Sequence, residues 1–218
     1  MSAAFSAKKN EHCLYLHGFL SSGCSAKAAW LRQMNRSDPQ RPLGQWHAPT
    51  YAQANLLDSV QKLETRLQSW QLRREPFVLI GSSLGGYLAQ YLAHQFSAPY
   101  VLINPALAPL TLFTAYQGEH RNPYTSEKVW VNSAFSEALA ALAVPHLNLQ
   151  LPSLLLADLA DEVVDLQPAI KLYQSLPNAQ VTGFLGGNHA FAHRKEAWPL
   201  IADFVQRHLN VKIEQAAE

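Results

Sequence analysis

The chain has 218 residues, of which 48% are hydrophobic and 15% charged, and its formal net charge is +1. This composition predicts one globular domain over residues 1–218 and excludes a largely disordered chain. Because the basic residues are scattered and nearly balanced by acidic ones, the sequence gives no support to nucleic-acid binding.

No run of residues is long and apolar enough to cross a bilayer, and residues 1–11 contain no signal-peptide core. We therefore expect a cytoplasmic protein without membrane contact, with flexible ends at 1–11 and 211–218. The two cysteines, Cys13 and Cys24, fit no disulfide framework and no metal-ligand spacing, and the histidines form no metal-binding motif. We predict no metal and no other cofactor, and the sequence carries no indication of an oligomeric state.

Short apolar runs and stretches of helical periodicity alternate along most of the chain. The apolar runs predict strands at 13–16, 45–48, 77–80, 100–103, 154–157 and 180–185, and the periodic stretches predict helices at about 26–34, 52–74, 84–96 and 165–176, with a last helix ending near 209. This alternation predicts an α/β fold, a three-layer sandwich in which helices cover both faces of a mostly parallel sheet of about six strands.

The segment 106–151 interrupts this alternation. It carries apolar and aromatic residues among prolines and polar residues, and we expect helices and loops that form a small insertion over the active-site edge of the sheet. A substrate lid and plain packing on the sheet would both produce such a segment. Tyr116 and Tyr124 within it are candidate substrate-binding residues.

Polar side chains follow several of the predicted strands. In open parallel sheets, chemistry gathers at the carboxyl ends of the strands. Here those ends carry His17, Gly18, Ser83, Asn104, Asp158, Asp161 and His189. A serine, acids and a histidine are therefore expected to converge on one edge of the sheet.

The stretch Gly81-Ser-Ser-Leu-Gly85 fits the pattern G-x-S-x-G with Ser83 at its centre. In a nucleophile elbow such a serine sits on a strained turn between strand and helix, and small neighbours let the surrounding backbone pass close by. The pattern lies between a predicted buried strand and a predicted helix, which favours an elbow over an ordinary glycine-rich turn. No phosphate-loop pattern is present.

A serine hydroxyl needs a base, and His189 follows the last predicted strand directly after Gly186-Gly187-Asn188. The histidine in turn needs a carboxylate to hold its tautomer. Of the acids after the preceding strand, Asp161 in the loop is favoured over Asp158 on the strand end, and Asp165 is expected to cap a helix. The chain order serine, acid, histidine is that of α/β-hydrolases.

Two backbone amides are expected to form an oxyanion hole. One is Leu84 N–H, directly after the serine, and the other is Phe19 N–H, in the turn that His17 and Gly18 allow after the first strand. His17 is expected to shape this turn rather than act as a base. Because His17 and Gly18 lie beside the expected site, both are also candidate substrate-binding residues.

The sequence resembles the α/β-hydrolase superfamily and, within it, the small bacterial YqiA-like esterases. The matching stretches are Leu14–Phe19, Ser25–Lys27, Gly81–Tyr87, Asn104–Ala106, Asn122–Thr125, Asp161–Val163 and Gly186–Phe191. The resemblance implies a serine esterase with Ser83 as nucleophile, Asp161 as acid and His189 as base. It also implies activity on short-chain p-nitrophenyl esters and on acyl-CoA thioesters. In one departure, Leu159-Ala160 precedes Asp161 where the family pattern has a glycine, and this keeps Asp158 open as the acid.

The expected partner is a small-molecule ester or thioester. A thioesterase, an amidase or a carbon–carbon bond hydrolase would use the same three residues, so these activities stay open. A catalytically silent hydrolase fold that serves as a binding protein is the alternative from another class.

Overall fold

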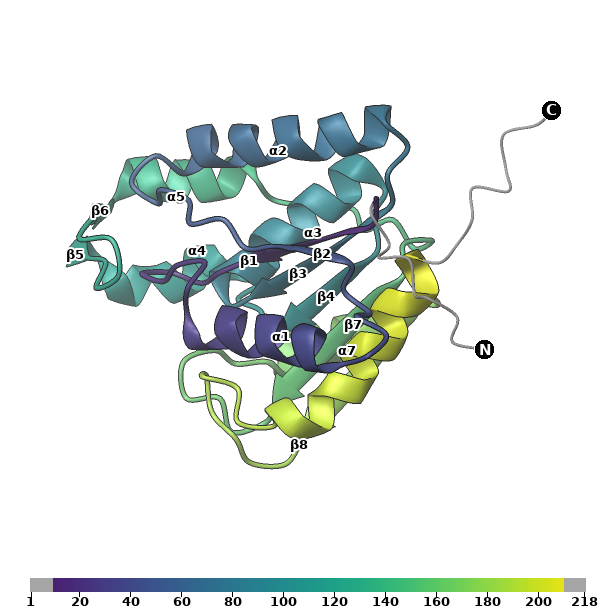
Figure 1. The fold of residues 1–218 in the computed structure, drawn as a ribbon. Coiled ribbons are helices and arrows are strands. Elements are labelled where there is room, and N and C mark those ends of the chain that lie inside the picture. The colour runs from purple at the N-terminus through teal and green to yellow at the C-terminus, as the bar shows by residue number, and fades with distance from the viewer. Residues whose placement is uncertain (1–9, 210–218) are drawn as a thin grey trace, which may run out of the picture.

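The computed structural model describes residues 10–209, and its centre is a six-stranded sheet in the order β2-β1-β3-β4-β7-β8 (Figure 1). The strands are β1 (His12–Leu16), β2 (Gln45–His47), β3 (Phe77–Ser82), β4 (Tyr100–Ile103), β7 (Ser153–Asp158) and β8 (Ala179–Phe184). Every neighbouring pair in this sheet is parallel. The prediction of a parallel sheet of about six strands is confirmed.

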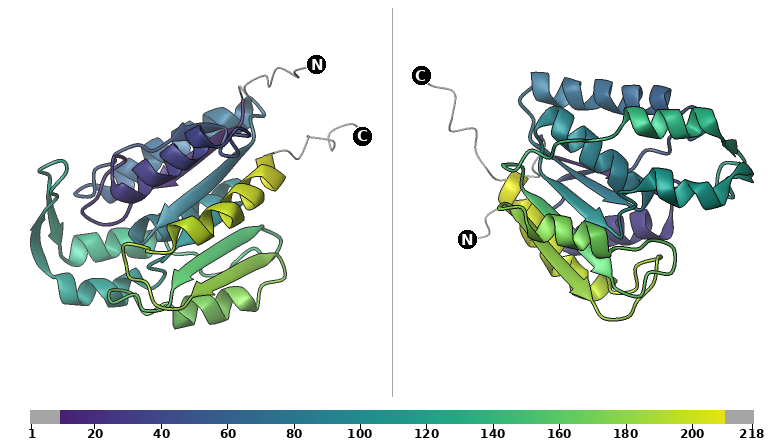
Figure 2. Two further views of the ribbon diagram at one scale, coloured as in Figure 1. Left: turned by 60° about the horizontal axis from the view of Figure 1, so that its bottom comes forward. Right: turned by 180° about the vertical axis from the view of Figure 1, so that it is seen from behind.

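Helices cover both faces of the sheet, which gives three layers (Figure 2). The helices α2 (Leu56–Leu72), α3 (Leu84–Phe96) and α6 (Gln167–Gln174) pack on one face, and α1 (Ala26–Ser37) and α7 (Arg194–Leu209) pack on the other. Alternate residues of a strand point to opposite faces. In β1, Leu14 and Leu16 therefore join the core under α2 and α3, while Cys13 and Tyr15 join the core under α1 and α7.

Two helices begin a few residues later than their periodicity predicts. The helix predicted from residue 52 starts at Leu56, because Ala52 still lies in the preceding loop, where its carbonyl accepts a hydrogen bond from Ser59 Oγ. The helix predicted from residue 165 starts at Gln167, whose N–H donates to Asp165 Oδ1 at 3.1 Å. The N-cap of α6 is Leu166, so the prediction that Asp165 caps this helix is wrong by one position: Asp165 precedes the cap and binds the first helical N–H from there.

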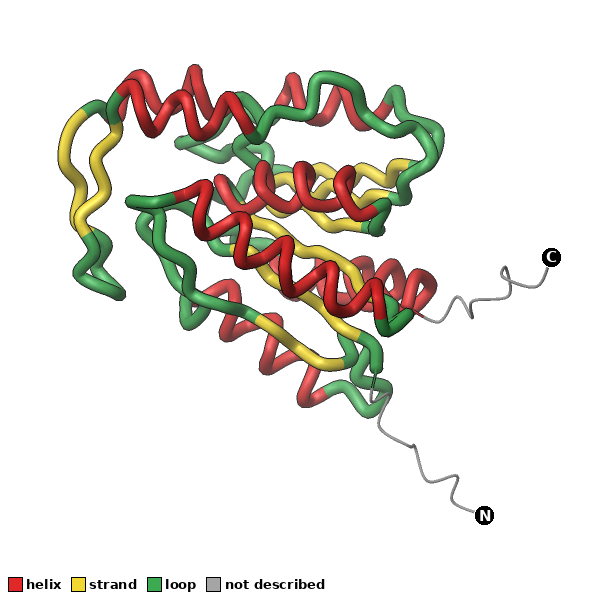
Figure 3. The backbone as a smooth tube through the Cα atoms, turned by 90° about the horizontal axis from the view of Figure 1, so that it is seen from above, coloured by secondary structure: helices red, strands yellow, loops and turns green. Residues whose placement is uncertain are grey.

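The segment between β4 and β7 differs from the prediction of helices and loops alone. It holds α4 (Pro109–Leu112), a 3-10 helix (Phe113–Tyr116) and α5 (Ser133–Ala141), but also an antiparallel hairpin of β5 (Gly118–Arg121) and β6 (Lys128–Val131). The hairpin extends away from the main sheet at one end of the molecule (Figure 3). Its signal is the alternation of β6, in which Val129 and Val131 are buried and Trp130 is exposed. Four residues were too few to distinguish from a helical segment by pattern alone.

The order of the strands reverses beside β1. The chain places β2 on one side of β1 and β3 on the other, so the topological switch point lies at the carboxyl ends of β1 and β3. Ligands of open α/β sheets bind at such a switch point. The turn after β1 and Ser83 after β3 flank this position.

Of the ends expected to be flexible, residues 1–9 and 211–218 lie outside the described residues. Glu11 lies inside them, and its carbonyl accepts a 2.8 Å hydrogen bond from Gln45 N at the start of β2. None of the helices within residues 10–209 combines the length and the apolar character that crossing a bilayer requires.

Candidate active site

Ser83 lies on the turn between β3 and α3, with a φ of 56° and a ψ of −125°. A positive φ is unfavourable for serine and is maintained only where the surroundings fix it. A Cβ at Gly81 would lie 2.1 Å from Gly85 O, and a Cβ at Gly85 would lie 2.1 Å from Leu16 O. Both glycines of the predicted elbow are therefore required by the close passage of neighbouring backbone.

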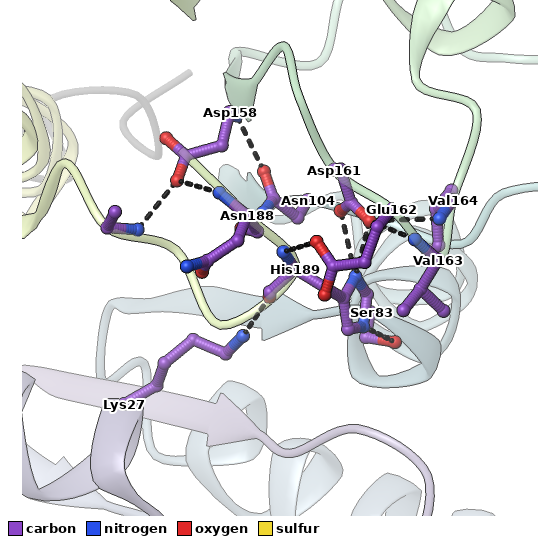
Figure 4. A network of polar contacts seen from close by, with 11 residues as sticks. Lys27, Ser83, Asn104, Asp158, Asp161, Glu162, Val163, Val164, Asn188 and His189 are labelled. Atoms are coloured by element: carbon purple, nitrogen blue, oxygen red, sulfur yellow. Dashed lines mark hydrogen bonds and ion pairs between the residues drawn. The ribbon is translucent and has the colours of Figure 1, made fainter. Parts of the chain in front are cut away.

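Ser83, His189 and Asp161 form one hydrogen-bonded chain (Figure 4). His189 Nε2 lies 3.0 Å from Ser83 Oγ, and His189 Nδ1 lies 2.8 Å and 3.0 Å from the two oxygens of Asp161. Because an ionised carboxylate only accepts, Nδ1 carries the proton and Nε2 is free to accept from the serine hydroxyl. The three predicted residues come from three loops and meet at the expected edge of the sheet.

Asp161 is held in its charged form. Burial alone would raise the pKa of Asp161, but hydrogen bonds from His189, Val164 and Val163 outweigh it, so the pKa lies below its usual value. The backbone N–H groups of Val163 and Val164 both donate to Asp161 Oδ1 at 2.9 Å. The loop thus presents an ionised carboxylate to the imidazole despite the side chain's 1% exposure.

Asp158, the alternative acid, contacts other parts of the loop that carries His189. Its Oδ2 accepts hydrogen bonds from Ala192 N at 2.6 Å and Asn188 N at 3.1 Å, and its Oδ1 lies 2.7 Å from His193 Nδ1. The carboxylate is fully buried, and it makes no hydrogen bond to His189. Of the two acids left open by the sequence, Asp161 is therefore the one that contacts His189.

Asn104, at the end of β4, joins the same network. Its Oδ1 accepts from Asp158 N at 2.8 Å, and its Nδ2 donates to Asn188 O at 2.9 Å. Like Asp158, it is completely buried. The two side chains together fasten the β8–α7 loop to the ends of β4 and β7.

The peptide groups on either side of His189 are held by charged side chains that no sequence pattern assigns to the site. His189 N–H donates to Glu162 Oε2 at 3.0 Å, and His189 O accepts from Lys27 Nζ at 2.8 Å (Figure 4). Burial, and to a smaller extent the nearby Arg194, lowers the pKa of Lys27 to about 8 against the opposing effect of the surrounding carboxylates. Lys27 belongs to a stretch that resembles the family, but 162 residues separate it from its partner.

The two predicted oxyanion donors lie on either side of Ser83. Leu84 is the first residue of α3, so its N–H has no acceptor within the helix. Phe19 lies in the turn after β1, and within residues 10–209 its amide makes no hydrogen bond. A Cβ at the neighbouring Gly18 would lie 3.1 Å from Ser83 Cβ and 3.5 Å from Ser83 Oγ, so this turn passes directly over the serine.

A buried glutamine, Gln53, holds this turn and was not found from the sequence. Gln53 Nε2 donates to Gly18 O at 2.9 Å, and its Oε1 accepts from Leu20 N at 2.8 Å. The backbone of Gln53 is in turn bound by Glu127 of the hairpin, whose Oε1 accepts from Gln53 N at 2.9 Å. Asn122 Nδ2 adds a 2.9 Å bond to Ser21 O. The turn of the hairpin, which carries Asn122 and Glu127, is thereby joined to the turn after β1, called here the oxyanion turn for the role predicted for its Phe19 amide.

The other predicted substrate-binding residues occupy different positions. His17 is completely buried, with its ring stacked 4.0 Å from that of Tyr51, and burial lowers its pKa to about 4. This placement fits the turn-shaping role and leaves no exposed surface for a substrate to touch. Tyr116 meets the ring of Phe19 edge-on at 6.4 Å. Tyr124 lies in the turn of the hairpin and is 56% exposed.

Within the part of the chain that the structure describes, no group of three or more His, Cys, Asp or Glu side chains is arranged to hold a metal ion. The hydrogen-bonded chain from Ser83 through His189 to Asp161 is an arrangement that can take the proton of a hydroxyl and so support covalent chemistry at the serine.

A family model matches residues 12–206, nearly the full length of the described chain. Its description is "Uncharacterised protein family (UPF0227)". The chain belongs to this family. The resemblance to the YqiA-like group of α/β-hydrolases is thereby confirmed.

Solved structures of α/β-hydrolases share the fold of this UPF0227 protein. Est1E from Butyrivibrio proteoclasticus is 13% identical with a TM-score of 0.69, over 93% of this chain and 89% of that one. The monoacylglycerol lipase of Paleococcus ferrophilus is 13% identical with a TM-score of 0.67, over 90% and 94%. The mouse alpha/beta hydrolase domain-containing protein 10 is 22% identical with a TM-score of 0.66, over 93% and 92%. The prediction of an α/β-hydrolase fold is confirmed.

Proposed function

We propose that this UPF0227 protein is a serine esterase that hydrolyses small carboxylic esters, with Ser83 as nucleophile, His189 as base and Asp161 as acid. The observation that carries the proposal is the hydrogen-bonded chain from Ser83 Oγ through His189 to Asp161, at a serine with positive φ. The name of one similar structure, a monoacylglycerol lipase, agrees with ester chemistry on this fold. We also propose that residues 1–218 act as one catalytic domain.

In the first half of the reaction, His189 Nε2 takes the proton of Ser83 Oγ while Oγ bonds to the ester carbonyl carbon. The carbonyl oxygen becomes an oxyanion, to which Leu84 N–H and Phe19 N–H donate. The bond to the leaving oxygen then breaks, and the alcohol departs with the proton held on His189. An acyl group remains on Ser83.

In the second half, His189 takes a proton from water as the water oxygen bonds to the acyl carbon. The tetrahedral intermediate collapses, Ser83 recovers its proton from His189, and the carboxylic acid is released. Asp161 stays ionised throughout and stabilises the imidazolium that forms twice in the cycle. The same steps with sulfur as the leaving atom would hydrolyse a thioester.

The deciding experiment measures hydrolysis of p-nitrophenyl acetate, butyrate and octanoate by the wild type, Ser83→Ala and Ser82→Ala. Ser82 is the matched control, because it is the neighbouring serine and is completely buried within β3. We expect Ser83→Ala to reduce kcat by up to about 10⁶-fold and Ser82→Ala to retain most of the turnover. Undiminished turnover in a folded Ser83→Ala variant would falsify the proposal.

A fluorophosphonate probe provides a second readout that does not depend on the choice of ester. Covalent labelling of the wild type but not of Ser83→Ala is the expected result. Labelling without ester turnover would redirect the test to acyl-CoA thioesters and then to amides. Absence of labelling would instead favour the binding-protein alternative.

A further inference from the structure

A cavity of about 420 Å³ lies between the start of the inserted segment and the loop that follows Asp161. One wall comes from Pro105 to Leu112, and the other comes from Val163 to Leu172. The lining is almost wholly apolar. Among the described residues that line it, Asp165 is the one ionisable side chain, and its Oδ1 already accepts a hydrogen bond from Gln167 N.

Both walls are attached directly to the proposed catalytic residues. Ala106 N–H donates to Ser83 O at 3.0 Å. Val163 and Val164 donate their N–H groups to Asp161 Oδ1 (Figure 4). Each wall of the cavity is therefore joined by hydrogen bonds to one proposed catalytic residue, the first wall to Ser83 and the second to Asp161, although neither of these two residues lines the cavity itself.

The size and chemistry of the cavity fit a ligand rather than a packing defect. Protein interiors are close-packed, and voids much larger than a water molecule are few. Ligand sites are typically concave and mainly apolar, with volumes of about 300 to 1,000 Å³. Here Leu172 is 44% exposed and Leu112 is half-buried beside the cavity, so apolar surface remains open to a partner.

We propose that this cavity receives an aliphatic chain of the ester substrate and sets the chain length that the enzyme prefers. The inference rests on the proposed esterase function and adds the substrate class to it. It also assigns substrate selection to α4, α6 and the loop after Asp161. The sequence had instead suggested the hairpin residue Tyr124 as a substrate-binding residue. The chain can belong to the acyl group or to the alcohol, since both are attached to the carbonyl that Ser83 attacks.

The test uses two ester series with the wild type. In one the leaving group is p-nitrophenol and the acyl group grows from acetate to decanoate. In the other the acyl group is acetate and the alcohol grows from methanol to octanol. We expect kcat/KM to rise by up to about fourfold for each methylene that enters the cavity, and to do so in one series only. That series identifies the part of the substrate that the cavity binds.

The variant Thr111→Trp tests the location. Thr111 is exposed and lines the cavity from α4, so a tryptophan there narrows the space without disturbing the core. The matched control is Leu110→Trp, because Leu110 precedes it on α4, is 45% exposed and does not line the cavity. We expect Thr111→Trp to shift the optimum to shorter chains and Leu110→Trp to leave it in place.

A second variant, Leu172→Ala, changes a residue of α6 that lines the cavity. It should weaken the preference for long chains, because it removes apolar surface that the substrate chain would cover. Length profiles that stay the same in Thr111→Trp and Leu172→Ala, with ester turnover intact, would overturn the cavity assignment alone. Absence of turnover by the wild type on every ester would overturn the proposed function and this inference with it.

Discussion

The Asp158 carboxylate accepts a hydrogen bond of 2.7 Å from His193 Nδ1, in the same loop that carries His189. With its bonds to the backbone of Asn188 and Ala192, this fully buried acid grips the loop on both sides of His189. Asp161 accepts the hydrogen bond from the imidazole of His189 itself. The two acids, three positions apart, therefore have different contacts: Asp158 binds the backbone of the loop, and Asp161 binds the imidazole ring of His189.

Asp158→Asn is expected to loosen this loop. An amide keeps one acceptor oxygen but turns an NH₂ group toward donors, so at least one buried N–H loses its partner, which costs about 1–3 kcal/mol. We expect the free energy of unfolding to fall by that amount and kcat/KM to fall by about 10-fold to 100-fold as His189 shifts. Asp203→Asn, at an exposed ion pair on α7, is the control and should change neither. Activity loss at full stability would indicate that Asp158 acts as the catalytic acid.

Asp161→Asn is expected to act on the chemistry more than on stability. An asparagine can place its NH₂ against Nδ1, which favours the wrong tautomer of His189 and leaves Nε2 unable to accept the serine proton. We expect kcat to fall by about 10³ to 10⁴, with the thermal midpoint little changed. Steady-state kinetics on p-nitrophenyl butyrate together with a melting curve will check this. Retained turnover here, combined with inactivity of Asp158→Asn, would reverse the two roles.

Lys27→Met should change how stability depends on pH. Burial lowers the pKa of Lys27 in the folded protein from its ordinary 10.5 to about 8. Between these values the unfolded chain binds more protons than the folded one, so the contribution of Lys27 to stability rises from about pH 8 to about 10.5. The free energy of unfolding of the wild type, minus that of Lys27→Met, should therefore increase as the pH is raised through this window.

Urea unfolding at a series of pH values measures this difference. Lys62→Met is the control, since the Lys62 side chain on α2 is 75% exposed and should show no comparable trend. Lys27→Met should also slow turnover by several-fold, because His189 O loses the donor that holds it. A difference in stability that stays flat across the window would mean that Lys27 is not desolvated in solution.

Gly18→Ala tests the closeness of the oxyanion turn to the serine. The added methyl group would meet Ser83 Cβ at 3.1 Å and Ser83 Oγ at 3.5 Å, where the substrate carbonyl has to pass. We expect kcat/KM to fall by about 10-fold to 100-fold through misplacement of the reacting groups, with a small change in the thermal midpoint. Full activity of the variant would show that the Phe19 amide is not aimed at the reacting carbonyl.

Much of the fold could be predicted from local patterns, because short buried strands and amphipathic helices leave clear periodicities. The main sheet follows the predicted strands closely, including the brief β2. The hairpin β5–β6 was missed because its strands are short and only β6 alternates clearly. For Ser83 and His189 the glycines beside them gave the signal, since tight turns at strand ends require them.

The remaining parts of the site depend on contacts between distant residues. Asp158 and Asp161 are separated by two residues, so no spacing rule could decide which one reaches His189, and only the path of the loop does so. Gln53 and Lys27 look like ordinary polar residues in the sequence. Their partners, Gly18 and His189, lie 35 and 162 residues away, and no local pattern reports such a pairing. The catalytic roles themselves stay predictions until the variants are measured.

The attachment of the hairpin to the oxyanion turn limits how this scaffold can be re-engineered. Glu127 holds Gln53, Gln53 holds Gly18, and Asn122 holds Ser21, so the inserted segment supports the turn from outside. Replacing that segment with one from another hydrolase would remove two of these three links. A chimera would keep its turn geometry only if the donor segment brought equivalents of Glu127 and Asn122 with it, so the insertion cannot be exchanged as an independent module.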